Sequence, residues 1–518
     1  MWPLIDQLVC QGVTDFFVAP GSRSTPLAIA AAKRGRLHRH FDERGLGFYA
    51  LGYALAQEKP VAIIVTSGTA VGNLVPAVME AHHASVPLIV ITADRPAELQ
   101  ECSANQTTSQ TNIFRDFVRW QFSFEPTMPE AAVRSQAAHA VMRAKNGPVH
   151  LNCHCREPLY PAASGSVGKQ IALDLGRMCS VAAHTVPAHG VIVLGRLPKR
   201  SDVKDVLSLG ERLGWPVLAD VLSNARTEAK GSQIRHFDWI TEMPEVEAVL
   251  HFGERMVSKR LKLQTKMYTH ISPHTHWNDP SHLITSRVVS EIPEFCNLVT
   301  GAKDPEWLSQ WQTLDAEAAS RLDLAFENAP FTESSALRAL HNLSGHAVFL
   351  GNSMPIREAD WFLFPENAKG FFCNRGLSGI DGNVATAVGL AEGSGKPVIA
   401  VLGDLTTLHD LNSLALLRHA SVPVKLVVSN NDGGGIFSHL AVAEDPEFEK
   451  LWGFGHGLGF EHAAKMFGIG YVRVDSVNEL VAAMQTAGTC VVEMITSRKE
   501  NALFHKHLKE AVISHLFA

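Results

Sequence analysis

Short, almost continuously apolar segments recur along the chain, each followed by a turn rich in Gly or Ser and then by a helical pattern. Val61–Val65 is such a segment; the turn 66–69 follows it, a helical stretch runs to His83, and residues 87–92 are apolar again. Strands that are apolar at every position are typical of parallel sheets buried on both faces. This region therefore predicts a strand–helix–strand unit with parallel strands.

The same pattern returns in two later parts of the chain. Residues 397–402 are apolar, a helical stretch follows to about Ala420, and residues 424–428 form the next apolar segment. A third region of this kind opens with the apolar segment 190–195. Three α/β domains in series, each with a doubly wound parallel sheet, are the predicted fold.

The 518 residues of the chain exceed what one hydrophobic core normally holds, which agrees with three domains. Residues 161–187, rich in Ala, Ser and Gly, and the polar helical stretch 303–328 are the predicted connections. We expect an N-terminal domain at 1–165, a central domain at 186–302 and a C-terminal domain at 330–518.

Composition and charge narrow the class of protein. The net charge is -6 and no basic tail or stripe is present, which disfavours a nucleic-acid partner. Apolar runs such as Val61–Val65 fall far short of the ~20 residues of a membrane span, and the first residues lack a signal-peptide pattern. The eight cysteines are scattered, as in proteins of reducing compartments. We expect a cytoplasmic protein without a membrane partner.

Two polar turns follow neighbouring apolar segments in the last region. Asp404 comes directly after one segment and Asn431 after the next, 27 positions later (431 minus 404). One helix and one strand fit between them, so both reach the same sheet edge, where open parallel sheets bind ligands. With the carbonyl of Gly433 they form a set of oxygen ligands suited to Mg²⁺ beside a phosphate. Either motif alone is more typical of an ordinary turn, and only the two together at this spacing favour the metal site.

The spacing of Gly403-Asp404 and Asn430-Asn431 resembles the signature of thiamin diphosphate-dependent enzymes, which begins Gly-Asp-Gly and ends Asn-Asn about thirty residues later. Leu405 replaces the third residue of that signature, as in one branch of the superfamily. The resemblance implies thiamin diphosphate as cofactor with Mg²⁺, or Mn²⁺ in its place. It also implies an activating Glu after an N-terminal strand, and Glu43 fits. Taken alone, Glu43 also suits the first turn of a helix through the helix dipole.

Further segments, in the right order along the chain, resemble the 2-succinyl-5-enolpyruvyl-6-hydroxy-3-cyclohexene-1-carboxylate (SEPHCHC) synthase family of menaquinone biosynthesis. They are 19–26, 42–47, 66–69, 92–96, 104–106, 351–353, 374–376, 379–382 and 403–405. Members of that family are transferases that decarboxylate 2-oxoglutarate and add the resulting succinyl carbanion equivalent to isochorismate in a Stetter-like reaction. The resemblance implies that activity, and a homodimer or homotetramer with active sites between subunits.

The resemblance also implies the residues that contact ligands. For the cofactor they are Glu43, Ser353, Ile380, Gly403, Asp404, Asn431, Gly433, Ile436 and Phe437, and for the substrates Ser22, Arg23, Arg95, Gln106, Lys259, Arg260, Ser353, Arg357 and Arg375. Both substrates are dicarboxylates, and the planar fork of Arg grips a carboxylate through two donors. Each Arg taken singly also fits a surface or domain-interface ion pair. Ile380, Ile436 and Phe437 equally fit ordinary core packing.

Two other functions share parts of these patterns. An acetolactate synthase-like carboligase acting on pyruvate would share the cofactor residues, but it would not need the set of basic residues. A nucleotide-dependent oxidoreductase would share the alternating strands and helices, but neither glycine-rich nucleotide motif is present. A non-catalytic homologue would have no need to keep Glu43, Asp404 and Asn431 together.

Overall fold

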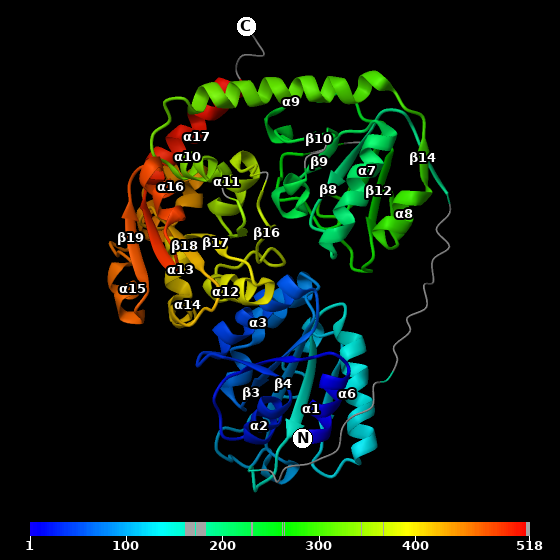
Figure 1. The fold of residues 1–518 in the computed structure, drawn as a ribbon, viewed down its shortest axis with the longest axis vertical. Helices are drawn as coiled ribbons and strands as arrows, with labels where there is room; N and C mark the ends of the chain where they lie inside the picture. Colours follow the sequence, from blue (N-terminus) through cyan, green and yellow to red (C-terminus); the bar gives the residue numbers. More distant parts are fainter. Residues whose placement is uncertain are drawn as a thin grey trace.

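Three six-stranded sheets, all parallel, form the framework of the computed structural model (Figure 1). The structure describes residues 1–160, 171, 183–228, 231–261, 263, 265–342, 344–365 and 367–513. The N-terminal part lies at the bottom of Figure 1, the central part at the upper right and the C-terminal part at the left. The predicted fold class is confirmed.

The first sheet has the strand order β2-β1-β3-β4-β6-β5. Its strands are β1 (Asp15–Val18), β2 (Arg36–Arg39), β3 (Val61–Val65), β4 (Leu88–Asp94), β5 (Gln121–Phe124) and β6 (Val149–His154). The helices around it are α1 (Trp2–Cys10), α2 (Thr25–Arg34), α3 (Glu43–Gln57), α4 (Thr69–Gly72), α5 (Val75–His83) and α6 (Glu130–Ala144). β3 and β4 are buried at every position, as the apolar pattern predicted.

The central sheet has the order β10-β9-β8-β11-β12-β13, the arrangement of dinucleotide-binding folds counted from β8. It is built from β8 (Gly190–Leu194), β9 (Val217–Ala219), β10 (Gln233–Ile234), β11 (Ala248–Phe252), β12 (Met267–Ser272) and β13 (Ser286–Val289), with α7 (Val203–Leu213) and α8 (Ile292–Leu298). A separate pair joins β7 (His184–Val186) to β14 (Val299–Gly301).

The third sheet, β16-β15-β17-β18-β20-β19, repeats the order of the first. Its strands are β15 (Ala347–Leu350), β16 (Phe371–Phe372), β17 (Val398–Gly403), β18 (Val424–Asn430), β19 (Gly470–Val474) and β20 (Cys490–Ile495). Its helices are α10 (Glu333–Ala339), α11 (Met354–Phe362), α12 (Asn383–Ser394), α13 (Asp404–His409), α14 (Leu414–Arg418), α15 (Glu461–Phe467), α16 (Val477–Gln485) and α17 (Arg498–Ile513). The helical stretch predicted after residue 402 is therefore two short helices, α13 and α14.

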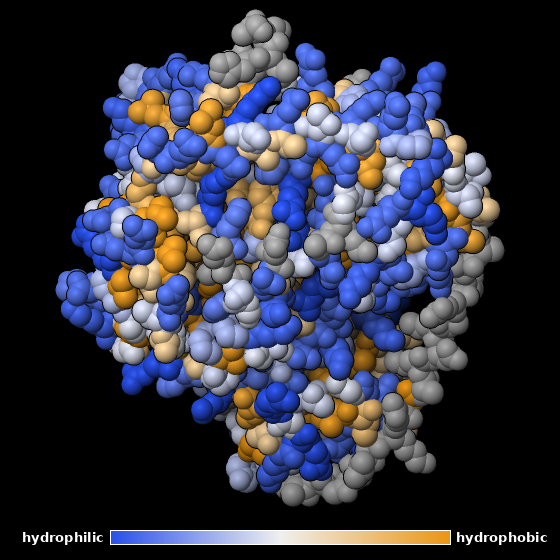
Figure 2. All heavy atoms as spheres, turned by 45° about the horizontal axis from the view of Figure 1, so that its top comes forward, coloured by the Kyte–Doolittle hydropathy of each residue, from blue (hydrophilic) through white to orange (hydrophobic). Residues whose placement is uncertain are grey.

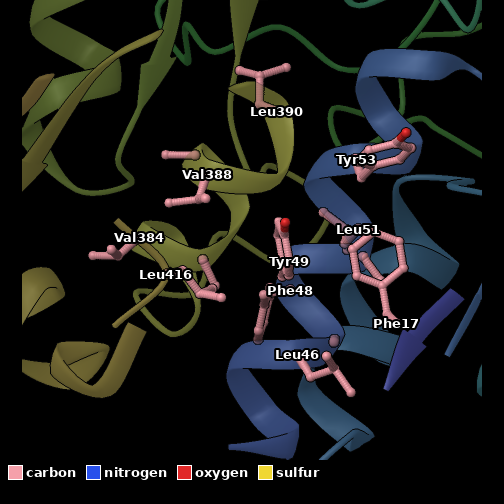
Figure 3. Close-up of a cluster of buried hydrophobic side chains, with 14 of the residues drawn as sticks. Phe17, Leu46, Phe48, Tyr49, Leu51, Tyr53, Val384, Val388, Leu390 and Leu416 are labelled. Carbon is pink, nitrogen blue, oxygen red and sulfur yellow. The ribbon is translucent and has the colours of Figure 1, made fainter. Parts of the chain in front are cut away.

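Helices α3 and α12 hold the N-terminal and C-terminal parts together. Aromatic and aliphatic side chains of α3 and aliphatic side chains of α12 belong to one shared core (Figure 3). The backbones approach so closely that a Cβ on Gly52 would lie 2.1 Å from the carbonyl oxygen of Thr386, and one on Gly389 equally close to that of Tyr49. This contact fixes α3, and with it Glu43 at its first turn, against the C-terminal part.

The predicted connection at 303–328 is a single helix, α9 (Pro305–Phe326), which crosses the top of Figure 1. Trp307 and Trp311 pack into the central core, whereas Ala318 and Leu322 pack against Phe362 and α17. The connection is thus a helix shared by two cores. Most of the other predicted connection, 161–187, lies outside the described residues, and the exact domain boundaries stay a prediction.

The surface seen in Figure 2 is largely hydrophilic, with hydrophobic residues in small groups. In the part of the chain that the structure describes, no helix is both long and apolar enough to cross a membrane.

Candidate functional site

The edge of the third sheet brings the predicted metal ligands together. β17 and β18 are neighbours, with Gly403 opposite Ser429, so the residues after both strands meet. Asp404 Oδ2 accepts hydrogen bonds from the backbone N–H of Asn431 at 3.2 Å and of Gly433 at 2.9 Å. Asp404 is buried, and it begins α13. The backbones of the predicted ligands are therefore in direct contact with the Asp404 carboxylate.

The side-chain amide of Asn431 is hydrogen-bonded through its nitrogen but not through its oxygen. Its Nδ2 donates to Glu333 Oε1 at 2.6 Å, and its own backbone carbonyl accepts from Arg498 Nε at 3.3 Å. Its Oδ1 is buried and has no hydrogen-bond partner among the described residues. A buried amide oxygen without a partner is costly and needs an explanation, and a role as a cation ligand provides one.

The turn after Asn431 depends on glycine. Gly433 has a φ of 130°, and a Cβ on it would lie 1.9 Å from the carbonyl oxygen of Gly453. A Cβ on Gly403, by contrast, would meet no atom closer than 3.8 Å, that of Thr406 Oγ1. The Gly433 turn is packed from behind, whereas open space remains beside Gly403, where a backbone can approach a phosphate closely.

His456 is a neighbour of this site that the sequence patterns did not reveal. Its Nε2 lies 3.2 Å from Asp404 Oδ2, and its Nδ1 accepts from the N–H of Leu458 at 3.0 Å. Burial raises the pKa of Asp404, while the N–H groups of Gly433 and Leu405 and the His456 ring act to lower it. No motif with a fixed spacing joins His456 to Asp404, so only the folded structure shows the contact.

The residues at this edge fit a hard divalent cation. Asp404 supplies a carboxylate, Asn431 an unpartnered amide oxygen, and Gly433 a backbone carbonyl nearby. Within the described residues there is no cluster of three or more His, Cys, Asp or Glu side chains arranged for a metal. A site with one carboxylate suits Mg²⁺, which takes its remaining ligands from substrate phosphates and water.

Glu43 stands where the sequence predicted, at the first turn of α3 behind β2. The preceding Asp42 caps the helix by accepting from the N–H of Arg44 at 3.0 Å. Glu43 is half-buried, and its carboxylate has no hydrogen bond or ion pair within the described part of the chain. Arg44 donates to the carbonyl of His409 at 2.7 Å, at the end of α13 opposite to Asp404.

Three of the predicted substrate residues gather at the edge of the first sheet. Arg95 donates to Ser67 Oγ, and Gln106 Nε2 donates to the carbonyl of Ser67 at 2.8 Å. Arg23 binds the carbonyl of Cys155 at 3.1 Å. Burial, and then the positive charge of Arg23, lower the pKa of Arg95. Arg23 also forms an ion pair with Glu157, at 3.4 Å. Ser22, in the same turn, is exposed.

A second pair of cations lies in the C-terminal part. Arg375 donates to Asn352 Oδ1 at 3.2 Å and to Ser378 Oγ at 3.1 Å, while Arg357 donates to the carbonyl of Ser353. Burial, and then the charge of Arg375, lower the pKa of Arg357. Ser353 directly precedes α11 and has a φ of 72°, a backbone conformation that residues other than Gly rarely adopt. Such outliers are concentrated at functional sites.

Lys259 and Arg260, the predicted substrate residues of the central domain, lie apart from both pairs of arginines. Arg260 lies over the rings of Trp361 at 4.8 Å and Trp239 at 5.6 Å, near the end of α11 away from Ser353. Lys259 is exposed. The structure therefore separates these two residues from the other predicted substrate contacts.

The predicted apolar contacts of the cofactor, Ile380, Ile436 and Phe437, lie in two segments between strands and helices of the third domain. Ile436 and Phe437 lie in the short helix Gly435–His439 that directly follows the glycine turn, and both are half-buried. Ile380 is half-buried in the loop before α12, where Gly379 accepts from Asn352 Nδ2 at 2.9 Å. All three side chains retain surface that a ligand could cover.

Comparison with known proteins identifies the family of the chain. Family models match in three parts of the chain: "Thiamine pyrophosphate enzyme, N-terminal TPP binding domain" at residues 3–118, "Middle domain of thiamine pyrophosphate" at 178–350, and "Thiamine pyrophosphate enzyme, C-terminal TPP binding domain" at 361–494.

Individual relatives match over nearly the full length. The 2-succinyl-5-enolpyruvyl-6-hydroxy-3-cyclohexene-1-carboxylate synthase of Rubrobacter xylanophilus is 40% identical, over 98% of this chain and 96% of the relative. Proteins of the same name from Bacillus velezensis and Salinibacter ruber are 36% and 37% identical, each over 98% of this chain and over 96% and 95% of the relative.

Proposed function

The chain belongs to the SEPHCHC synthase family of thiamine pyrophosphate enzymes, and on this premise we propose that it is a transferase of menaquinone biosynthesis that joins 2-oxoglutarate to isochorismate. In this reaction 2-oxoglutarate loses carbon dioxide and its succinyl unit adds to isochorismate in a conjugate, Stetter-like step. The observation that carries the proposal is the sheet edge where Asp404, Asn431 and Gly433 meet. An acetolactate synthase-like reaction is not favoured by the relatives' names.

The proposed metal ligands are Asp404, Asn431 Oδ1 and the carbonyl of Gly433, holding Mg²⁺ or, in its place, Mn²⁺. The unpartnered Oδ1 supports this assignment. Around the thiamin diphosphate we place Gly403, Ser353, Ile380, Ile436 and Phe437. When bound, the cofactor supplies the carbanion chemistry of the reaction.

The proposed role of Glu43 is to hold a proton at the nitrogen of the aminopyrimidine ring. Its carboxylate is held at a helix start and is free of other partners among the described residues, which supports this role. With the cofactor bound, a carboxyl group there would supply the proton that this nitrogen takes up. Glu43 is thus the proposed catalytic residue.

The proposed substrate contacts are cationic pairs with polar neighbours. Arg23 and Arg95, with Ser22 and Gln106, would bind one set of carboxylates, and Arg357 and Arg375, with Ser353, another. Each pair places two guanidinium groups among polar side chains, and the planar fork of Arg suits a carboxylate, which supports this assignment. Lys259 and Arg260 would contribute only after their segment moves away from Trp361.

We place the complete active site between two copies of this chain, in a homodimer or homotetramer. Four large apolar side chains are more than half exposed in the two segments beside the Gly433 turn: Leu440 at 53%, Leu451 at 58%, Phe454 at 63% and Leu458 at 53%. Apolar surface of this kind marks an interaction site. The chain's own α3 contacts the His409 end of α13, which leaves the Asp404 end for another subunit. The cytoplasm stays the predicted location.

The reaction is tested by following isochorismate absorbance with purified protein. We expect isochorismate to be consumed, with release of carbon dioxide, only when 2-oxoglutarate, thiamin diphosphate and Mg²⁺ are all present. The mixture with each component omitted in turn is the control. Carbon dioxide release from pyruvate, without consumption of isochorismate, would move the assignment to the rival carboligase.

The shared active site predicts complementation between two inactive variants, Glu43→Gln and Asp404→Ala. In a mixed dimer one site carries both changes and the other carries neither. After the subunits are unfolded together and reassembled at equal amounts, we expect about a quarter of the unchanged protein's activity, since half the dimers are mixed. Each variant reassembled alone is the control. No recovery in mixtures shown to contain mixed dimers would place Glu43 and Asp404 of one site in one chain.

A further inference from the structure

A buried polar network lies behind the proposed metal ligand Asn431. Glu333, at the first turn of α10, is 4% exposed. It accepts from Asn431 Nδ2 at 2.6 Å, from Thr496 Oγ1 at 3.3 Å and from Asn501 Nδ2 at 3.4 Å. None of these supporting residues, Glu333, Thr496 and Asn501, belongs to the motifs that identify the cofactor site.

Each polar group of Asn431 except one is already bound. Its N–H donates to Asp404, its carbonyl accepts from Arg498, and its Nδ2 donates to Glu333. The two ends of an Asn amide are similar in size, so the side chain can turn over and exchange them. Glu333 receives three donors, and this pattern favours Nδ2 facing Glu333 and Oδ1 facing away.

We infer that Glu333 is a positioning residue for the divalent cation: its carboxylate fixes the orientation of the Asn431 amide so that Oδ1 is presented as a metal ligand. The inference rests on the proposed metal site. Ligands of metals are commonly oriented by such outer partners, whose loss typically weakens metal binding about 10–100-fold. Without Glu333, Asn431 would lose its fixed orientation, and its amide N–H would compete for the place of the ligand oxygen.

The second carboxylate of the network serves as a matched control. Glu358 is fully buried and binds His505 Nε2 at 2.6 Å, Ser334 Oγ at 2.7 Å and Asn501 Nδ2 at 3.2 Å, but it does not contact Asn431. Its loss disturbs the same network without touching the ligand. General damage to the fold should therefore appear in Glu358 variants as much as in Glu333 variants.

The test measures Mn²⁺ binding directly, from the electron paramagnetic resonance signal of free Mn²⁺, with thiamin diphosphate present. We expect Glu333→Met to raise the Kd for Mn²⁺ by about 10–100-fold. Glu333→Gln, whose Oε1 can still accept from Asn431, should stay close to the unchanged protein, and so should Glu358→Met. Circular dichroism melting of each variant reports its folding. An unchanged Kd in Glu333→Met would overturn the inference.

If Glu333→Met does not fold, a second experiment exchanges the carboxylate of Glu333 with the amide of Asn431. Asn431→Asp alone places two carboxylates side by side, and we expect it to weaken Mn²⁺ binding. Adding Glu333→Gln supplies an amide donor toward the carboxylate introduced at position 431, so the double variant should bind Mn²⁺ more tightly than Asn431→Asp alone. Equal binding by the two would refute the orienting contact.

Mn²⁺ binding by Asp404→Ala distinguishes a failure of the proposed metal site from a failure of the role of Glu333. If Asp404→Ala binds Mn²⁺ as tightly as the unchanged protein, the metal site itself is wrongly placed, and the role of Glu333 is lost with it. If Asp404→Ala abolishes binding while Glu333→Met leaves it unchanged, only the role of Glu333 is overturned.

Discussion

A Glu43→Gln variant is expected to lose about 10²–10⁴-fold in turnover, the usual contribution of a positioned acid or base, while still binding thiamin diphosphate and metal. The amide keeps the shape of the side chain and its place at the first turn of α3. It cannot deliver a proton to the ring nitrogen of the cofactor. The loss should therefore appear in kcat, with cofactor affinity changed far less.

The neighbouring carboxylate provides the control for this experiment. Asp42 caps α3 through the N–H of Arg44, and Asn is as good a cap as Asp. Asp42→Asn should thus fold and turn over normally, although it also removes a carboxylate from the same turn. Cofactor binding is followed by calorimetry and turnover by isochorismate absorbance. Full activity in Glu43→Gln would remove Glu43 from the reaction.

The strands could be predicted because runs of consecutive apolar residues indicate strands that are buried on both faces. β3 and β17 are apolar at nearly every position, a pattern typical of parallel strands, and β18 opens with mostly apolar residues. The meeting of Asp404 with Asn431 followed from the same reasoning, since the ends of adjacent parallel strands share one edge. Local pattern thus determined both the sheets and the centre of the candidate site.

The supporting residues were not predictable, because they come from segments distant in the sequence. Glu333 reaches Asn431 across 98 positions, and α10, which carries it, has no distinguishing motif. His456 reaches Asp404 from a loop without regular structure. The stacking of Arg260 on Trp361 likewise depends on how the central and C-terminal parts pack. Such contacts follow from domain packing, which single-sequence patterns do not report.

An Asp404→Ala variant is expected to lose the metal-dependent part of its affinity for thiamin diphosphate. The Asp404 carboxylate provides the only negative charge among the three proposed ligands, and it also accepts N–H bonds from Asn431 and Gly433 that shape the turn. Its removal deprives the cation of its charged ligand and the turn of its anchor. We expect a loss of affinity of at least about 100-fold, at the upper end of what supporting residues cause.

The measurement compares thiamin diphosphate binding by calorimetry with Mg²⁺ and with the metal removed by a chelator. In the unchanged protein, adding Mg²⁺ should tighten binding strongly; in Asp404→Ala the two conditions should give nearly the same weak Kd. Asp432→Asn is the matched control, because Asp432 is exposed and an Asn there can still accept from the N–H groups of His456 and Gly457. The opposite result would be that Mg²⁺ still tightens thiamin diphosphate binding in Asp404→Ala but no longer does so in Asp432→Asn. The metal would then be bound by the exposed carboxylate of Asp432 and not by the buried carboxylate of Asp404.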